Sequence, residues 1–327
     1  MPVQTYLEAI RGALFDEMAR DGRVIVLGED VAGRGGVFGA TRGLLEAYGE
    51  QRVIDTPLAE VGIAGVAIGA AANGLLPVAE MQFADYIHPA FDQIVNEAAR
   101  IRYRSNGGWG CPIVIRAPFG GGVHGGLYHS QSTEAFYCHV PGVKVVVPST
   151  PADARGLLLA AIRDPDPVLY FEHKGAYRRL RGEVPSAMNA IALGRADLKR
   201  PGRHLTAITY GLMVHTCLEA AERVAIEGID AAVLDLRTLQ PLDREAILAA
   251  ARESGKILIV HEDTRSGGLA GEITATICED AFEFLDAPIM RVTGPDAPAM
   301  PFSAPLEAAF LPTVDRVADT MRQLARY

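Results

Sequence analysis

The stretch Asp55–Asn73, DTPLAEVGIAGVAIGAAAN, decides how the first half of the chain is expected to fold. Pro57 lies where an extended segment gives way to a helix start. Eight of the thirteen residues from Glu60 to Ala72 are Gly or Ala. Each helical Gly costs about 1 kcal/mol relative to Ala, so the three glycines of this helix indicate that another backbone packs very close to it.

Glu60 is the acid at the start of this helix, and two interpretations of it are open. An acid in the first turn of a helix interacts favourably with the helix dipole, and that role needs no ligand. Alternatively, an acid kept in apolar surroundings holds its proton and can present it to a ligand nitrogen. The rest of the chain decides between the two.

Short apolar strands alternate with amphipathic helices, which predicts parallel sheets covered on both faces. The apolar periodicity lapses between Gly175 and His204. We therefore expect two doubly wound α/β domains, a parallel-sheet domain at 1–180 and a smaller one at 204–327, joined by a linker at 181–203. The expected strands are 23–28, 52–55, 77–83, 113–117, 143–147, 168–171, 205–210, 231–236, 257–260 and 288–292; the expected helices include 6–19, 152–163, 268–284 and 314–325, with helical spacing at 94–101 and a proline-rich connection at 295–312.

Composition excludes several classes of protein. The chain has 327 residues, of which 49% are hydrophobic and 22% charged, as in a folded globular protein. A net charge of −9 without a basic cluster excludes a nucleic-acid surface. No apolar run of about 18 residues predicts a membrane span, and the N-terminus lacks a signal-peptide pattern. The four cysteines have neither disulfide-framework nor metal spacing, so we expect a cytoplasmic protein.

Two glycine-rich stretches could approach a ligand. The run at 33–39, GRGGVFG, does not match a dinucleotide-binding fingerprint, and we interpret it as a flexible loop, with an interface loop as the open alternative. In the second stretch, five of the seven residues from Gly120 to Gly126 are Gly. His129 follows among hydroxyl and amide side chains that can fix its tautomer. The spacing of His124, His129 and His139 does not fit a zinc site, and no G-x-S-x-G motif indicates a serine hydrolase.

At this point the motifs resemble a known family. DTPLAE, EMQFADYIHPAFDQIVNEAARIRYRS, HGGLYHSQSTEAF, HVPGVKVVVPSTP and VLDLRTLQPLD are similar to the beta subunit of the decarboxylating first component of 2-oxo acid dehydrogenase complexes. The resemblance covers nearly the whole chain. It implies a pyrimidine-binding domain that holds part of thiamine diphosphate, followed by a domain like the transketolase C-terminal domain.

The resemblance also assigns roles to residues. Glu60 would contact the aminopyrimidine nitrogen and favour the imino tautomer that removes the thiazolium proton. His129 would lie near the reacting carbon and help to pass the acyl group to a lipoyl arm. The same resemblance implies that Leu58, Gln82 and Tyr86 line the pyrimidine ring. It further implies a structural potassium ion held by backbone carbonyls at Ile113, Ala161, Asp164 and Asp166.

One motif of the family is missing from this chain. Related enzymes bind the diphosphate through Mg²⁺ with a Gly-Asp-Gly motif followed later by Asn, and this chain contains no Gly-Asp-Gly. The resemblance therefore implies that an alpha subunit supplies the Mg²⁺ and diphosphate half of the site. We expect a heterotetramer of two alpha and two beta chains that is inactive as isolated beta and that works with a lipoyl acyltransferase component.

Substrate and role leave alternatives open. Within the family, the tract GGLYHSQSTEAF resembles branched-chain 2-oxo acid dehydrogenases more than pyruvate dehydrogenases, whereas VLDLRTLQPLD is shared and does not discriminate. The resemblance therefore favours a branched-chain 2-oxo acid such as 3-methyl-2-oxobutanoate, with pyruvate second and acetoin third. A hypothesis from a different class is a non-catalytic scaffold that docks the acyltransferase core and holds an alpha subunit. A Glu60→Gln variant distinguishes a catalytic subunit from a scaffold, because only a catalytic subunit needs that carboxylate for decarboxylation.

Overall fold

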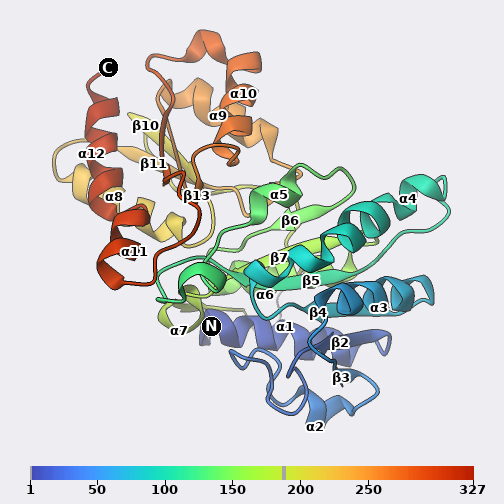
Figure 1. Ribbon diagram of the computed structural model, residues 1–327. Helices are drawn as coiled ribbons and strands as arrows, with labels where there is room; N and C mark the ends of the chain where they lie inside the picture. The colour runs from blue at the N-terminus through green and yellow to red at the C-terminus, as the bar shows by residue number, and fades with distance from the viewer. Residues whose placement is uncertain (1, 186–188) are drawn as a thin grey trace. The chain divides into compact units, whose positions relative to one another are not determined.

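The computed structural model of the protein describes residues 2–185 and 189–327 (Figure 1). Contacts along the chain divide it into two compact units. The first comprises Met1–Phe119 and Phe136–Leu193, and the second comprises Gly120–Ala135 and Gly194–Tyr327. The segment 120–135, which contains the second glycine-rich stretch, thus interrupts the first unit in sequence but packs with the second.

The first unit is built on a parallel sheet. Its strands follow the order β6-β7-β5-β4-β2-β3, and every neighbouring pair in this order is parallel. The chain runs from β2 to β3 on one side and then crosses to β4 on the other side of β2. Such a reversal creates a crevice at the carboxyl ends of the strands, here outside β2 and β4. The strands are β2 (Val24–Gly28), β3 (Val53–Asp55), β4 (Leu76–Glu80), β5 (Val114–Phe119), β6 (Lys144–Val146) and β7 (Val168–His173).

Helices cover this sheet, and their starts follow simple capping rules. The side chains and backbones of Thr5 and Glu8 bond reciprocally in a capping box at the start of α1. Thr150 caps α6 through the amide of Asp153. α1 packs against α6, and α3 packs against β4 (Figure 1). The helices are α1 (Tyr6–Arg20), α2 (Leu44–Tyr48), α3 (Glu60–Ala72), α4 (Ile101–Arg104), α5 (Glu134–Cys138), α6 (Pro151–Arg163) and α7 (Ala176–Arg179).

The helical spacing at 94–101 does not produce one regular helix. Short 3₁₀ turns at Ala84–Tyr86 and His88–Ala90 lead into a π-helical turn at Gln93–Glu97, another 3₁₀ turn at Ala98–Arg100, and α4. Ile94, Ala98 and Ile101 are nevertheless buried, as their spacing predicts. The predicted helical spacing is therefore confirmed, but the π turn and the 3₁₀ turn that follows it make this helical segment irregular.

The second unit also contains a mainly parallel sheet. Its strand order is β14-β13-β10-β11-β9, with β9 antiparallel at the edge. β10 is flanked by β11 and β13, so this sheet also has a reversal point at the carboxyl ends of β10 and β13. The strands of this sheet are β9 (Asp197–Arg200), β10 (Leu205–Thr209), β11 (Ala231–Asp235), β13 (Ile257–Thr264) and β14 (Met290–Gly294); β12 (Thr238–Gln240) is not part of it.

The helices of the second unit include one that the sequence pattern missed. α11 (Ala304–Phe310) lies within the stretch expected to be a proline-rich connection. Ser303 and Pro305 are start signals for this helix, and they were overlooked among the surrounding prolines. α8 and α12 pack together over the sheet. The other helices are α8 (Met213–Ala225), α9 (Arg244–Ser254), α10 (Ala270–Asp280) and α12 (Val314–Ala325).

These two sheets confirm the predicted α/β class with two doubly wound units. The stretch at 181–203 is more structured than a linker. β8 (Arg181–Glu183) pairs antiparallel with β1 (Val3–Thr5) in the first unit, and β9 pairs with β11 in the second. Apolar periodicity did not reveal these strands because most of their side chains are not buried.

A buried charge cluster joins three strands of the first sheet. Arg116 on β5 is fully buried and bonds both carboxylate oxygens of Glu172 on β7, at 2.6 and 2.8 Å. Its remaining nitrogen donates to Glu80 on β4 at 2.6 Å. Tyr177 also donates to Glu172, at 2.7 Å. Burial and the charge of Glu172 raise the pKa of Glu80, although Arg116 opposes the shift.

We expect Arg116→Met to lower the free energy of unfolding by about 3–5 kcal/mol, because it leaves two buried carboxylates without a cation. Glu80→Gln should cost less, roughly 1 kcal/mol, since the amide oxygen still accepts a hydrogen bond from Arg116. Urea unfolding measures both, with the exposed Arg104→Met as the control, expected within about 0.5 kcal/mol of the parent. Equal costs for the two buried substitutions would contradict this description of the cluster.

Candidate functional site

The predicted pyrimidine-site residues of the first unit gather around the carboxyl ends of three adjacent strands. In the sheet, Gly28 at the end of β2 pairs with Asp55 on one side and with Glu80 on the other. Glu29 follows β2 directly and Gln82 follows β4. Glu60 begins α3 after a short segment that leaves β3. Parallel pairing thus explains why residues up to 53 positions apart lie at one sheet edge.

Glu60 is buried beside a second acid that the sequence interpretation missed. Glu60 is 9% exposed and Glu29 is 7% exposed. Burial raises the pKa of Glu29, and the neighbouring charges of Glu60 and Asp30 raise it further. Within the described residues, Glu29 Oε1 is buried without a hydrogen-bond partner. Two buried acids with an unused oxygen suit a ligand that brings hydrogen-bond donors or shares a proton.

The side chains around these acids suit a flat ring. Leu58 is 80% exposed, which leaves an apolar side chain free to cover a ligand face. The amide of Gln82 donates to Asp30 Oδ2 at 3.4 Å. Phe83 lies edge-to-face with Tyr86 at 5.6 Å between ring centroids. Burial raises the pKa of Tyr86, with the charges of Asp85, Glu60 and Glu29 adding to the shift, so its hydroxyl stays a hydrogen-bond donor.

The residues present therefore fit the aminopyrimidine that the family implies. An aminopyrimidine needs an acid for one ring nitrogen, polar groups for its amino side and apolar contacts for its faces. Glu60 and the unpartnered Glu29 oxygen supply the acidic part, and Leu58 and Tyr86 supply contact surface. The only signal in the sequence for Glu29 was its position directly after a buried strand.

The glycine-rich run at 33–39 is held in place at its start and middle. Asp55 accepts hydrogen bonds from the amides of Ala32, at 2.7 Å, and Gly33, at 3.2 Å. A Cβ on Gly36, whose φ is +78°, would lie 3.0 Å from Glu80 Oε1. The loop therefore packs on the buried charge cluster. The flexibility of this loop stays a prediction; composition alone did not show that Asp55 and Glu80 face its backbone.

His129 lies in the segment that packs with the second unit. It follows the 3₁₀ turn Gly126–Tyr128 and is partly buried, while its neighbour Ser130 is fully buried. A Cβ on Gly125 would come within 2.7 Å of the Cβ of His129. The backbone of Gly125 thus packs directly on the histidine, which explains one of the glycines in this run.

The end of the same segment is anchored on a group of buried acids. Tyr210, directly after β10, donates to Glu134 Oε1 at 2.7 Å. Burial raises the pKa of Glu134 to about 8, and the charges of Asp263 and Glu262 contribute. Burial also raises the pKa of Asp263 to about 6. His261 stacks on Tyr210, with ring centroids 6.2 Å apart, and burial lowers its pKa to about 4.

The predicted potassium residues lie at the opposite, amino end of the first sheet. The carbonyl of Ile113 accepts from the amide of Val168 at 3.0 Å, and that of Ala161 accepts from the amide of Asp164 at 3.3 Å. The ammonium of Lys144 lies 2.6 Å from Asp164 Oδ1 and 3.9 Å from Asp166 Oδ2. Among the described residues, no group of His, Cys, Asp and Glu side chains is arranged to hold a metal ion.

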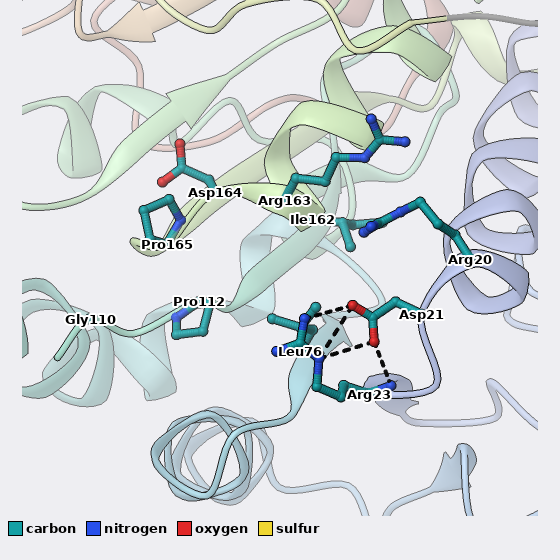
Figure 2. Close-up of a pocket in the computed structure, with 10 residues that line it drawn as sticks. All are labelled: Arg20, Asp21, Arg23, Leu76, Gly110, Pro112, Ile162, Arg163, Asp164 and Pro165. Carbon is teal, nitrogen blue, oxygen red and sulfur yellow. Dashed lines mark hydrogen bonds and ion pairs between the residues drawn. The ribbon is translucent and has the colours of Figure 1, made fainter.

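A pocket of about 450 Å³ opens at this same end (Figure 2). Arg23 bonds Asp21 at its edge, with a shortest contact of 2.7 Å. Arg163 and Arg20 also line it, but both pair with Glu17. Glu17 serves two of these arginines with one carboxylate, so it does not neutralise both of them. Asp164 is the predicted site residue that lines it.

Comparison with known proteins places the chain in a family. Residues 3–179 match the family "Transketolase, pyrimidine binding domain", and residues 194–317 match "Transketolase, C-terminal domain". Over 327 residues and all of both chains, the protein is 58% identical to the 2-oxoisovalerate dehydrogenase subunit beta of Bacillus subtilis (strain 168). The chain belongs to the beta subunits of the 2-oxo acid dehydrogenases. This confirms the family and the branched-chain type that the motifs predicted.

Other members of the family show the same full-length similarity. The pyruvate dehydrogenase E1 component subunit beta of B. subtilis (strain 168) is 46% identical over all of both chains. The mitochondrial 2-oxoisovalerate dehydrogenase subunit beta 2 of Arabidopsis thaliana is 48% identical over 98% of this chain and 88% of its own. A solved split-gene transketolase, described as an inactive beta4 tetramer, has the same fold, with a TM-score of 0.80, 24% identity and 98% coverage of each chain. Within the described residues, no helix has the length and apolar character needed to span a membrane.

We expect Glu134→Gln to change how the stability of this beta subunit depends on pH. An acid whose folded pKa is raised binds its proton more tightly in the folded chain, so its contribution is present below pH 4.5 and is lost as the pH rises to about 8. Against the neutral variant, the parent should lose up to about 1.4 kcal/mol per pH unit across this window. Thermal unfolding between pH 5 and 9 measures the difference. With exposed Glu253→Gln as the control, a difference that does not grow with pH would contradict the assignment.

Proposed function

We propose that this chain is the beta subunit of a branched-chain 2-oxo acid dehydrogenase. The observation that carries the proposal is the 58% identity over the full length of a 2-oxoisovalerate dehydrogenase beta subunit, against 46% for the pyruvate enzyme of the same organism. The reaction takes a branched 2-oxo acid, a lipoyl disulfide and a proton, and gives carbon dioxide and an S-acylated dihydrolipoyl group. The new C–S bond replaces the C–C bond to the carboxylate, and the disulfide is reduced.

Thiamine diphosphate, when bound, would supply the electron sink that makes loss of the carboxylate feasible. On this chain, Glu60 would hold a proton at the aminopyrimidine nitrogen, and Glu29 would lie beside it as a second acid. Leu58 would cover a ring face, with Gln82 and Tyr86 along its edge. Support comes from the burial of the two acids and from the unpartnered oxygen of Glu29.

An alpha subunit would complete the site. This chain has no Gly-Asp-Gly motif, so the Mg²⁺ and diphosphate half is assigned to that partner, in an assembly of two alpha and two beta chains. Exposed apolar residues on the Gly/Ala-rich α3, Val61 and Val66, support close packing with another chain. A lipoyl acyltransferase component would receive the acyl group.

His129 is assigned to the transfer of the acyl group to the lipoyl arm. A histidine can give a proton to the opening disulfide and stabilise the charge that develops there. Its support here is the packing of Gly125 on its Cβ, which restricts where the side chain can lie. The potassium site at Ile113, Ala161, Asp164 and Asp166 and the domain limits 1–180 and 204–327 stay predictions. The carbonyls of Ile113 and Ala161 would be shared between an amide and the ion.

Co-expression with an alpha subunit that contains Gly-Asp-Gly tests the function directly. We expect an assembly that decarboxylates 3-methyl-2-oxobutanoate in preference to pyruvate, whereas isolated beta is inactive. Decarboxylation is followed with an artificial electron acceptor, and product identity is confirmed by acylation of a lipoyl domain. A pyruvate preference would overturn the substrate assignment but leave the chemistry intact, and activity of isolated beta would overturn the division of the site.

Glu60→Gln distinguishes a catalytic subunit from a scaffold. Because the amide cannot hold the carboxyl proton, we expect decarboxylation to fall roughly 100-fold or more while assembly with alpha is unchanged. Exposed Glu46→Gln is the matched control and should keep parent activity. If the Glu60 variant assembled and decarboxylated normally, the chain would be a scaffold in this respect.

His129→Ala should separate the two half-reactions. We expect acylation of a lipoyl domain to fall roughly 100-fold, while decarboxylation with an artificial acceptor changes by less than about threefold. Exposed His139→Ala, a nearby histidine with no assigned role, is the control. An equal loss in both steps would place His129 in the first half-reaction instead.

A further inference from the structure

The loop that precedes His129 is held by one buried carboxylate from the far end of the chain. Glu307 on α11 is 1% exposed. Its Oε1 accepts hydrogen bonds from the amides of Gly122, at 2.9 Å, and His124, at 3.2 Å. Its Oε2 lies 2.5 Å from Nδ1 of His124. A single side chain therefore fixes three donors of the Gly120–Gly126 run, which we call the glycine loop.

His124 takes a backbone conformation that needs this support. Its φ of +56° is in the left-handed region, where a residue with a Cβ is strained. Its side chain is 59% exposed, so burial does not hold it there. The two contacts with Glu307, through the amide and through the ring, hold the residue in this conformation. Among the described residues of the glycine loop, His124 is the only non-glycine residue with a strained backbone, and removing the Glu307 carboxylate removes both contacts that hold it.

The constraint on His124 reaches His129 through Gly125. The amide of Gly125, the next residue, donates to Ser130 Oγ at 3.1 Å. A Cβ on Gly125 would lie 2.7 Å from the Cβ of His129 and 2.8 Å from its carbonyl oxygen. The backbone at 125 is thus in tight contact with the residues on either side of the 129–130 peptide. A shift of the glycine loop by a few tenths of an ångström therefore moves the Gly125 backbone on which His129 packs.

A second buried acid holds the start of the same loop. Glu262 on β13 accepts from the amide of Gly121 at 3.0 Å. A Cβ on Gly121 would lie 2.8 Å from Cε of Met300 and 3.1 Å from Leu311. These contacts fix the start of the glycine loop at Gly121, whereas Glu307 fixes the part nearer to His129, at Gly122 and His124. The two acids therefore have separable effects.

We propose that Glu307 is a positioning residue for His129, and that its carboxylate fixes the glycine loop in the conformation that acyl transfer requires. This inference rests on the proposed role of His129. It assigns α11, a helix of seven residues with no other role in the site, to the second half-reaction. It places no group of Glu307 on the substrate or cofactor.

The test uses the full beta chain assembled with its alpha subunit. Glu307→Ala removes all three acceptor contacts, and we expect acylation of a lipoyl domain to fall roughly 10- to 100-fold, as small misplacements of a reacting group do. Decarboxylation with an artificial acceptor and the KM for the 2-oxo acid should stay within about twofold. Glu307→Gln keeps one acceptor oxygen for the two amides and should recover much of the acylation rate. Exposed Glu272→Ala controls for loss of an acid in the same unit.

Hydrogen exchange supplies a readout besides activity. In Glu307→Ala we expect faster exchange in peptides covering 120–126 and parent-like exchange in the β10 and β13 peptides. If Glu307→Ala does not assemble, His124→Asn replaces it, because Asn tolerates a left-handed backbone but lacks the Nδ1 contact. That variant should give a smaller loss, again confined to acylation.

The outcomes separate the two hypotheses. If His129→Ala lowers acylation but Glu307→Ala and His124→Asn lower neither step, or both steps equally, the positioning role is wrong and the proposed function stands. If His129→Ala leaves acylation unchanged, the assignment of His129 fails and the positioning role fails with it. A selective loss in both variants, with faster exchange of the glycine loop, supports the proposal.

Discussion

Parallel strand pairing is the constraint on which both candidate regions depend. In a parallel sheet, every strand delivers its following residue to the same edge, and reversal of the strand order leaves a crevice there. In the first unit this edge receives Glu29 after β2, Gln82 after β4 and the helix that begins at Glu60. The buried Arg116 cluster ties β4, β5 and β7 together at that edge. The positions of these acids are thus set by the sheet.

The second unit also has a reversal in its strand order, but the crevice at its strand ends has a different use. Its reversal point lies at the carboxyl ends of β10 and β13, where Tyr210 and Glu262 are found. There the chain's own segment 120–135 binds, held at its start by Glu262 and towards its end by Tyr210. A crevice that often receives a ligand in such folds is used here to hold a loop. Because this segment contains His129, the crevice supports a side chain with a proposed function.

Much of this arrangement could be predicted from the sequence, and there are physical reasons why the remaining features could not. Apolar strand runs and amphipathic helix periodicity predicted the sheets and most helices, and the motifs predicted the family. α11 was missed because prolines on both sides masked the Ser303 and Pro305 start signal. Glu29 and Glu307 were missed because only the strand order and long-range contacts show that they are buried beside functional loops. Periodicity carries no information about contacts between distant segments.

The contacts of Glu307 also bear on the order in which the chain can reach its native state. They join residues 183 and 185 positions apart. Contacts of such high sequence separation form late, because a long loop must close before they contribute. During synthesis, the glycine loop leaves the ribosome well before α11 exists. The first unit can therefore bring Glu29 and Glu60 together before the glycine loop acquires its contacts with Glu307, which lies in the last tenth of the polypeptide.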